Sequence, residues 1–261
     1  VDVLDLASRD FLPRLVSGGY DVAFVAMHGA YGEDGCVQGL LEVLHMPYTF
    51  SGVAASAVAS EKQLSKAVYE AAKIRAPRGV DLAAGTVLTD DQVDSLVGEL
   101  GLPLFVKPAA NGSSFGISRV TERAGVNDAI ARASGGGGRV LIEECVEGTE
   151  ITVPVIGNEE PRALPIVEIV TGAEFYDLKV KYEPSSMHHV IPARLTPGVY
   201  AKAQDLAVRA HRALGCRGCS RSDFIVTADG EPVILETNTI PGMTASSLLP
   251  DSARHGGIEF P

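Results

Sequence analysis

The chain has 261 residues, of which 46% are hydrophobic and 21% are charged. Such a composition buries enough apolar surface for folding and excludes an intrinsically disordered protein. The formal net charge of −11 argues against nucleic acid as a partner, because binding to nucleic acid needs a surplus of Lys and Arg. No apolar run reaches membrane-spanning length and no signal peptide opens the sequence, so we expect no membrane partner.

The cysteines are too few and too scattered for a disulfide framework, which favours a reducing cytoplasmic location. Cys216 and Cys219 have CxxC spacing, but no second pair and no nearby histidine completes a zinc site. We therefore expect these two residues to be ordinary core thiols at the end of a helix.

Residues 1–50 have the pattern of an α/β unit. An amphipathic stretch at 4–15 predicts a helix, and the apolar run 21–27 predicts a buried parallel strand. A helical pattern follows Gly35, and an extended segment restarts at 47–48. This order is typical of a βαβ unit.

Residues 51–138 read as a small α/β domain. A helix is predicted at 56–72 and a strand at 104–107, followed by a polar Gly/Ser loop at 111–116. From 139 onward strands dominate. Alternation and β-branching predict the strands 140–143, 150–155 and 163–169, then an unperiodic segment at 176–195, a helix at 200–214 and a final hairpin.

The final hairpin carries a candidate metal site. Asp229-Gly230 between two β-prone runs is a strong signal for a two-residue turn. Counting outward from that turn sets the register, and side chains that alternate with period two place the chemically active positions on one face. The expected pairs are Ala228 with Glu231, Asp223 with Glu236, and Arg221 with Asn238.

Opposed carboxylates repel one another unless a cation lies between them. Asp223 and Glu236, together with the amide oxygen of Asn238, form a hard-oxygen set that suits magnesium. The alternative is a solvent-facing hairpin whose carboxylates pair with surface Lys or Arg.

A second candidate site follows the strand that ends at Lys107. The loop 108–116 is rich in small residues whose backbone N–H groups can close over phosphate oxygens. It lacks the Walker A order, and a surface turn is the alternative interpretation. Lys62, on a predicted helix, and Lys181, in the unperiodic segment, could join Lys107 at a triphosphate, although spacing alone leaves them as solvated surface lysines.

Several multi-residue strings occur in the order of one family. They include His28–Gly35, Gln38–Glu42, Ser51–Ala57, the Lys107 loop, Phe175–Asp177, Lys181-Tyr182 and Asn238–Thr244. In these strings the chain closely resembles the D-alanine:D-alanine ligases of the ATP-grasp superfamily. The resemblance implies an α/β (α+β ATP-grasp) fold with a partial N-terminal domain at 1–50, a central subdomain at 51–138, and a C-terminal antiparallel-sheet subdomain with the metal site at 139–261.

The resemblance also implies an activity: ATP phosphorylates the carboxylate of one D-alanine, and the amine of a second D-alanine attacks the acyl phosphate, which supplies the dipeptide for peptidoglycan precursors. ATP and two magnesium ions would be the cofactors, with manganese as a substitute ion. Implied ATP-binding residues are Lys62, Lys107, Ser113, Ser114, Glu143, Glu144, Cys145, Val146, Glu150 and Lys181, and the implied metal ligands are Asp223, Glu236 and Asn238.

The remaining implied roles concern the reacting groups. Arg221 and the Gly242 N–H would stabilise the acyl phosphate and the oxyanion of the intermediate. Ser113 and Tyr182 would join a hydrogen-bonded group at the site, and the tyrosine favours D-alanine as acceptor. His28 and Glu33 match positions for the first alanine, and Ser247 and Leu248 match positions for the carboxylate of the second.

The sequence also departs from the family. It begins at Val1 without Met and stops at Pro261, and it lacks the Gly-rich opening strand-turn and the glutamate that contacts the first alanine. We therefore expect a chain cut at both ends. Two alternatives follow: another ATP-grasp carboxylate ligase, such as a D-alanine:D-lactate enzyme, or a nucleotide-binding but inactive fragment. The family also implies a homodimer.

Overall fold

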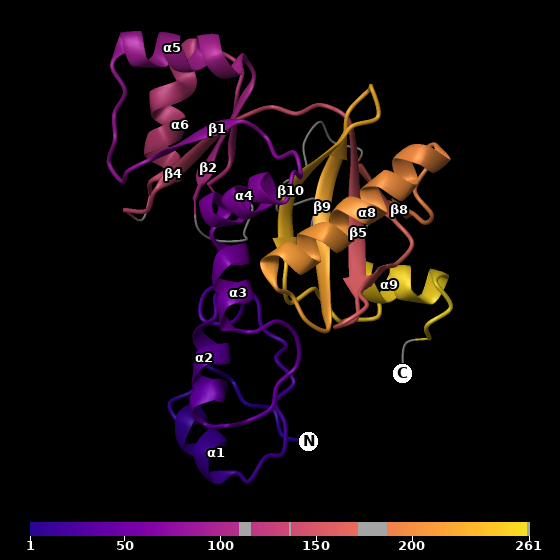
Figure 1. The fold of residues 1–261 in the computed structure, drawn as a ribbon. Helices are drawn as coiled ribbons and strands as arrows, with labels where there is room; N and C mark the ends of the chain where they lie inside the picture. The colour runs from indigo at the N-terminus through magenta and orange to yellow at the C-terminus, as the bar shows by residue number, and fades with distance from the viewer. Residues whose placement is uncertain (110–115, 136, 172–186, 260–261) are drawn as a thin grey trace.

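The computed structural model describes residues 1–109, 116–135, 137–171 and 187–259. Within these residues, two sheets lie side by side and a column of helices leads to them from the N-terminus (Figure 1). This mixed architecture confirms the expected α/β class. In chain order the elements are α1 (Phe11–Ser17), α2 (Cys36–Val43), α3 (Val53–Ser60), α4 (Lys62–Ala71), β1 (Gly79–Leu82), α5 (Asp90–Leu100), β2 (Leu104–Pro108), β3 (Ser118–Val120), the 3-10 helix η1 (Arg123–Gly125), α6 (Val126–Ala133), β4 (Val140–Glu144), β5 (Thr149–Ile156), β6 (Arg162–Ala163), β7 (Val167–Thr171), β8 (Met187–Val190), α8 (Pro197–Leu214), β9 (Cys219–Val226), β10 (Pro232–Asn238) and α9 (Leu248–His255).

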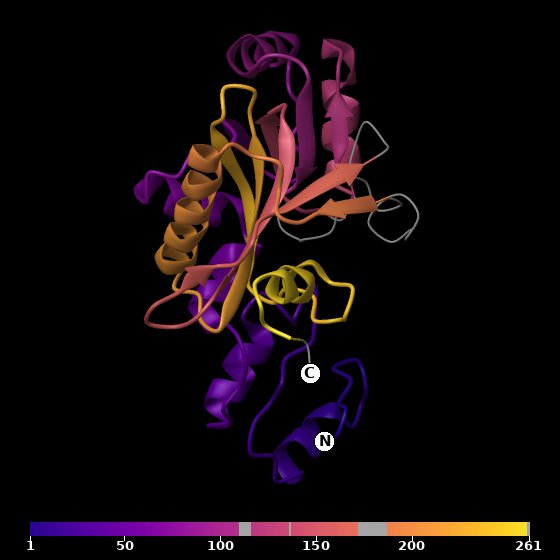
Figure 2. The ribbon, with the colours of Figure 1, turned by 90° about the vertical axis from the view of Figure 1, so that its right-hand side faces the viewer.

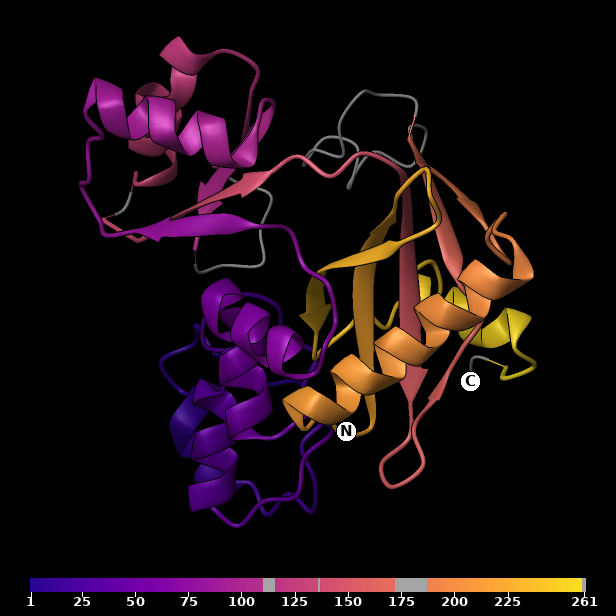
Figure 3. The same cartoon turned by 45° about the horizontal axis from the view of Figure 1, so that its top comes forward.

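The smaller sheet has the strand order β1-β4-β2-β3, and each neighbouring pair is antiparallel. Helices α5 and α6 lie over this sheet (Figure 3), and apolar side chains such as Val106, Ile130 and Ile142 fill the layer between. Helix α5 begins with a capping box between Thr89 and Gln92, which satisfies backbone donors that a helix start leaves unpaired. Because β4 belongs to this sheet, the sheet continues past the boundary at 138 that the sequence suggested.

The larger sheet has the order β10-β9-β5-β7-β8, and β6 pairs with β5. From Ser220 onward its strand β9 alternates: Ser222, Phe224 and Val226 are buried on the face toward the core shared with α8, while the residues between them are half-buried on the other face. Alternation of this kind is what a sheet with one covered face requires. Figure 2 shows α8 on one face of the sheet and α9 on the other side. The face of β9 that α8 does not cover is therefore available to form a site.

Helices α3 and α4 correct the prediction of one helix at 56–72. Glu61 is extended, with φ −100° and ψ 105°, so the helix is interrupted there. The backbone N–H of Lys62 donates instead to the carbonyl of Ala109, at 3.3 Å, just beyond β2. Further along α4, the fully buried Tyr69 packs in the core of the larger sheet. Helix α4 thus contacts both sheets.

The N-terminal segment differs from its prediction. The run 21–27 forms a single parallel bridge, between Ala23 and Tyr48, rather than a buried strand. Val25 is buried, but Val22 is 59% and Phe24 is 61% exposed. Apolar content marks a tendency to be buried, whereas a strand also needs backbone partners along its length. The helix expected at 4–15 is shorter and begins at Phe11, while α2 follows its prediction.

Cys216 and Cys219 are buried free thiols after α8, as predicted. Burial raises the pKa of the Cys216 thiol to about 11 and that of Cys219 to about 12. Thiols with such pKa values stay protonated and unreactive at neutral pH. Across the described ranges, no helix combines the length and apolar character needed to cross a membrane.

Candidate active site

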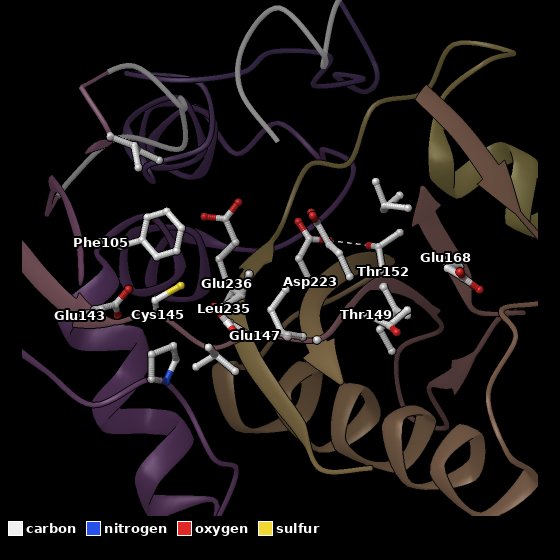
Figure 4. A pocket seen from close by; sticks show the side chains of 18 of the residues that line it. Phe105, Glu143, Cys145, Glu147, Thr149, Thr152, Glu168, Asp223, Leu235 and Glu236 are labelled. Atoms are coloured by element: carbon white, nitrogen blue, oxygen red, sulfur yellow. Dashed lines mark hydrogen bonds between the residues drawn. The ribbon is translucent and has the colours of Figure 1, made fainter. Parts of the chain in front are cut away.

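A cleft of about 770 Å³ lies where the two sheets face one another. Strands β2 and β4 line it on one side, β5, β7, β9 and β10 line it on the other, and Figure 4 shows their side chains turned into it. Many residues named from the sequence meet here. Those that line the cleft are Lys62, Lys107, Glu143, Glu144, Cys145, Val146, Glu150, Arg221, Asp223, Glu236 and Leu248.

The β9–β10 hairpin carries the two carboxylates, and its turn differs from the prediction. Thr227, rather than Ala228, pairs with Glu231, because the Thr227 N–H donates to the Glu231 carbonyl at 3.0 Å. Gly230 adopts φ +82° and closes a three-residue loop, a common alternative to the two-residue turn. The predicted pairing of Ala228 with Glu231 is therefore wrong.

The two pairs that matter for the site are nevertheless confirmed: Asp223 lies opposite Glu236, and Arg221 lies opposite Asn238. The register shifts by one residue between Ile234 and Glu236, which is the signature of a β-bulge. This shift cancels the extra residue in the turn. Leu235, the bulged residue, and Glu236 both line the cleft although they are consecutive (Figure 4).

Buried hydroxyls hold the hairpin from behind. Thr237 follows Glu236 and points to the opposite face, where its Oγ1 lies 2.9 Å from Tyr69 Oη and 2.8 Å from Ser222 Oγ. All three side chains are almost completely buried. Burial raises the pKa of Tyr69 far above its ordinary value, so the hydroxyl remains a neutral hydrogen-bond donor. This network stabilises β10 at Thr237, between the candidate metal ligands Glu236 and Asn238.

On the cleft side, each hairpin carboxylate contacts a cation. The Arg221 guanidinium makes two contacts of 3.1 Å with Asp223, whose Oδ1 also accepts a hydrogen bond from Thr152. The Lys62 ammonium lies 3.5 Å from Glu236. We call Arg221, Asp223, Glu236 and Asn238 the carboxylate hairpin.

The carboxylate hairpin suits a magnesium ion by its donor chemistry. Its side chains offer only oxygen ligands, and Asp223 and Glu236 are 19% and 33% exposed to the cleft. The Asn238 Oδ1 accepts from the Ile240 N–H at 2.8 Å, and an amide oxygen keeps a second lone pair for a metal. In the described part of the chain, no cluster of three His, Cys, Asp or Glu residues could hold a metal ion. A site here would thus need ligands from substrate or water, as magnesium commonly uses.

A second group of charges, which we call the lysine corner, consists of Lys66, Lys107 and Glu143. The Glu143 carboxylate is only 5% exposed; Lys66 Nζ lies 2.7 Å from its Oε1, and Lys107 contacts its Oε2. Burial alone would raise the pKa of Glu143, but the two ammonium groups hold it below its ordinary value. The carboxylate is therefore charged at neutral pH.

Lys66 was not predicted from the sequence. It lies four residues after Lys62 on α4, and residues at this spacing share one face of a helix. This periodicity could have suggested that both lysines face the same cleft. Its partner Glu143, however, is 77 residues away in the sequence, and no local pattern predicts that contact.

The segment after β4 forms another wall of the cleft. Glu144 forms an ion pair with Arg78, whose side chain lies 2.7 Å from the carboxylate. Burial raises the pKa of Glu144, but the Arg78 backbone N–H and guanidinium outweigh this effect and lower it. The Cys145 N–H donates to the Pro103 carbonyl at 3.2 Å. The backbone of this wall is thus held at both residues.

The residues expected to bind the alanines are less concentrated. Glu33 accepts a hydrogen bond from the Gly29 N–H at 3.0 Å and lies 3.8 Å from His28 Nδ1. Neither His28 nor Glu33 lines the cleft. Ser247 precedes α9 and accepts from the Thr244 N–H at 3.1 Å.

Gly242 lies close against Ser247, since a Cβ at Gly242 would come within 2.8 Å of the serine Oγ. Leu248, the first residue of α9, lines the cleft, whereas Gly242 and Ser247 do not. The four predicted residues Ser113, Ser114, Lys181 and Tyr182 lie outside the described residues.

The sequence also missed a charged pair at the far end of the cleft. Arg194 donates to Glu168 through its backbone N–H, at 2.9 Å, and through its guanidinium. Glu168 lies on β7 and both residues line the cleft. The guanidinium and the backbone N–H lower the pKa of Glu168 more than burial raises it. This pair ties the segment after β8 to β7.

Two antiparallel sheets that enclose a cleft between lysines and paired carboxylates define an ATP-grasp fold, the class of enzymes that activate a carboxylate with ATP. Comparisons with known proteins identify the family within this class. The family model described as "D-ala D-ala ligase C-terminus" matches residues 79–261, and "D-ala D-ala ligase N-terminus" matches residues 9–51. The chain belongs to the D-alanine–D-alanine ligase family.

Individual relatives agree. A curated D-alanine–D-alanine ligase from Desulforudis audaxviator is 46% identical over 258 residues, which cover 97% of this chain and 82% of that protein. The crystal structure of a Bacillus anthracis D-alanine–D-alanine ligase superposes with a TM-score of 0.84 at 34% identity, covering 98% of this chain and 81% of that chain. A Bacillus anthracis D-alanine–D-alanine ligase complexed with ATP superposes with a TM-score of 0.80 at 33% identity, covering 96% of this chain and 78% of that chain.

Proposed function

We propose that this protein joins two D-alanines into a dipeptide at the expense of ATP, for peptidoglycan precursor synthesis in the cytoplasm. The observation that carries the proposal is the convergence of Lys62, Lys107, Asp223 and Glu236 in one cleft from α4, β2, β9 and β10. A triphosphate needs cations on one side and a carboxylate-bound divalent ion on the other. The cleft offers both sets of groups.

In the first step, an oxygen of the D-alanine carboxylate attacks the γ-phosphorus of ATP, and ADP leaves with the bond electrons. In the second step, the neutral amine of another D-alanine attacks the acyl carbon, the bond between that carbon and the phosphate oxygen breaks, and inorganic phosphate departs with the amine proton. Lys62 and Lys107 would hold phosphate oxygens of ATP. The wall from Glu143 to Val146, together with Glu150 on β5, would contact the adenine and ribose, which the position of these residues along the cleft supports.

Asp223, Glu236 and Asn238 are the residues that would hold magnesium. The ion would neutralise phosphate charge and orient the γ-phosphate. Arg221 lies beside these residues with 12% of its side chain exposed. Its guanidinium would stabilise the acyl phosphate and the oxyanion of the tetrahedral intermediate, with the Gly242 N–H as a second donor.

The alanine subsites would be formed by His28 and Glu33 for the first substrate, and by Ser247 and Leu248 for the carboxylate of the second. Leu248 on the cleft wall and Ser247 beside Gly242 support the second assignment. Ser113, Ser114, Lys181 and Tyr182 would complete the phosphate and acceptor contacts. We propose a homodimer as the assembly.

Phosphate release tests the proposal. With ATP, magnesium and D-alanine alone, the protein should release phosphate and form D-alanyl-D-alanine in equal amounts, measured by a coupled phosphate assay and mass spectrometry. Addition of D-lactate should produce no depsipeptide. Phosphate release that requires D-lactate would identify the other ligase class, and ATP binding without phosphate release would identify a nucleotide-binding protein without catalysis.

A further inference from the structure

Lys66 is a charged residue beside the cleft that the proposed mechanism does not use. Its side chain extends from the same face of α4 as Lys62, one helical turn further on, and is 17% exposed. The ammonium contacts Glu143 at 2.7 Å from behind, and Lys66 itself does not line the cleft. Lys66 is therefore not placed to contact a nucleotide in the cleft directly.

The contact matters because Glu143 also binds Lys107. A buried carboxylate beside one ammonium forms a neutral pair, and the ammonium then attracts an anion weakly. Here two ammonium groups share one carboxylate, so the lysine corner carries a net positive charge. Lys66 Nζ binds Oε1 and Lys107 Nζ binds Oε2, so each lysine has its own oxygen of Glu143.

Several neighbouring charges among the described residues have opposite partners of their own. Lys62 lies against Glu236, and Arg119 lies 3.8 Å from the exposed Glu147. Glu144, the next residue after Glu143, is paired with Arg78. The positive charge of the lysine corner is therefore a local feature that favours a phosphate group near Lys107.

We propose that Lys66 is a positioning residue, which binds the Glu143 carboxylate and so leaves the Lys107 ammonium able to attract the phosphates of ATP. Lys66 acts through Glu143 and does not touch the substrate. This inference rests on the proposed function, because it takes ATP as the ligand of the cleft. It also explains why a buried carboxylate stands next to a phosphate-binding lysine: the carboxylate orients Lys107, and Lys66 supplies the compensating charge.

The experiment compares ATP binding by the full chain and its variants, using titration calorimetry with magnesium present. Lys66→Met should weaken ATP binding about tenfold, because it turns the corner into a neutral pair at short range. Lys66→Arg should retain affinity close to that of the unsubstituted chain. In steady-state assays, Lys66→Met should raise KM for ATP and leave kcat and KM for D-alanine unchanged. Lys66→Gln replaces the methionine variant if thermal melting shows that the latter is unfolded.

A double variant separates action through Glu143 from a general loss of charge. In a Glu143→Gln background, adding Lys66→Met should change ATP affinity by less than about twofold, since coupled residues are not additive. The matched control is Lys202→Met, which removes a lysine paired with Glu231 at the hairpin turn, and it should leave ATP affinity unchanged.

Three results would overturn the inference: no loss of affinity in Lys66→Met, an equal loss in the Glu143→Gln background, or an equal loss in Lys202→Met. ATP binding by the unsubstituted chain distinguishes a failure of the proposed function from a failure of this inference alone. If that chain binds no ATP, both the proposed function and the inference fail. If it binds ATP and Lys66→Met binds equally well, only the inference fails.

Discussion

The carboxylate hairpin and the lysine corner use the same residue types in opposite proportions. In the hairpin, among the described residues, Asp223 contacts Arg221 and Glu236 contacts Lys62, and the two carboxylates are 19% and 33% exposed. In the corner, one carboxylate with 5% exposure contacts two lysines. Helix α4 connects the sites, because Lys62 contacts the hairpin and Lys66 contacts the corner.

Under the proposed function, this difference would let one cleft receive both halves of a metal–phosphate complex. Accessible carboxylates can accept a divalent cation, whereas a buried carboxylate with two ammonium groups attracts an anion. Burial decides which role a carboxylate takes. A glutamate that ion pairs enclose is a structural counter-charge, and one that remains reachable can become a ligand.

The largest effect is expected from a substitution in the carboxylate hairpin. Glu236→Ala should lower magnesium-dependent turnover by at least about a hundredfold and leave the protein folded, because it removes a proposed metal ligand from an accessible strand face. Phosphate release and circular dichroism measure the two outcomes. Glu231→Ala, which removes a glutamate from the same hairpin near its turn, is the control and should keep full activity. Unchanged turnover in Glu236→Ala would refute the metal assignment.

A smaller effect is expected in the lysine corner, where the charge of Glu143 should contribute to stability. The pKa of Glu143 is lowered in the folded protein, so its charged form stabilises the fold at neutral pH. This stability should be lost as pH falls from the ordinary value of 4.5 through the lower pKa of the folded state. Glu143→Gln should therefore be less stable than the unsubstituted chain at pH 7, with a difference that shrinks under acid conditions.

Thermal unfolding at a series of pH values measures that difference. The same substitution at the exposed Glu159 is the matched control. A constant difference for Glu143→Gln would show that the two lysines do not stabilise the charged carboxylate.

The smallest effect concerns the hydroxyl network behind the hairpin. Tyr69→Phe removes the donor to Thr237 and should cost about 1 kcal/mol of unfolding free energy, because Ser222 still bonds the threonine. Urea denaturation measures the change, and Tyr31→Phe, at a residue 64% exposed, is the control. A larger loss in the control than in Tyr69→Phe would contradict a stabilising role for this network.

Local sequence predicted the hairpin well and its details incompletely. Asp229-Gly230 identified a turn, and the pairs that bring Asp223 opposite Glu236 are observed, but neither the loop length nor the bulge was predicted. Turn type depends on which residue adopts positive φ, and a bulge depends on neighbours outside the hairpin. One such neighbour is Arg75, whose carbonyl accepts from the Ile234 N–H at 2.8 Å.

Non-local contacts explain the other failures. The apolar run 21–27 correctly indicated burial at Val25, but a strand requires pairing that local composition does not encode. Family resemblance identified Lys62 and Lys107, which do meet in the cleft, while their individual roles stay predictions. Lys66 was not predicted from the sequence, because its importance depends on a residue in a distant strand.

The bulge at Leu235 has a consequence for how densely a strand can present side chains to a ligand. A regular strand places one side chain on a given face roughly every 7 Å. Leu235 and Glu236, as neighbours in the chain, both reach the cleft. One dipeptide can thus present an apolar surface and a charged oxygen to adjacent parts of the same ligand, a base and its phosphates, without a second strand.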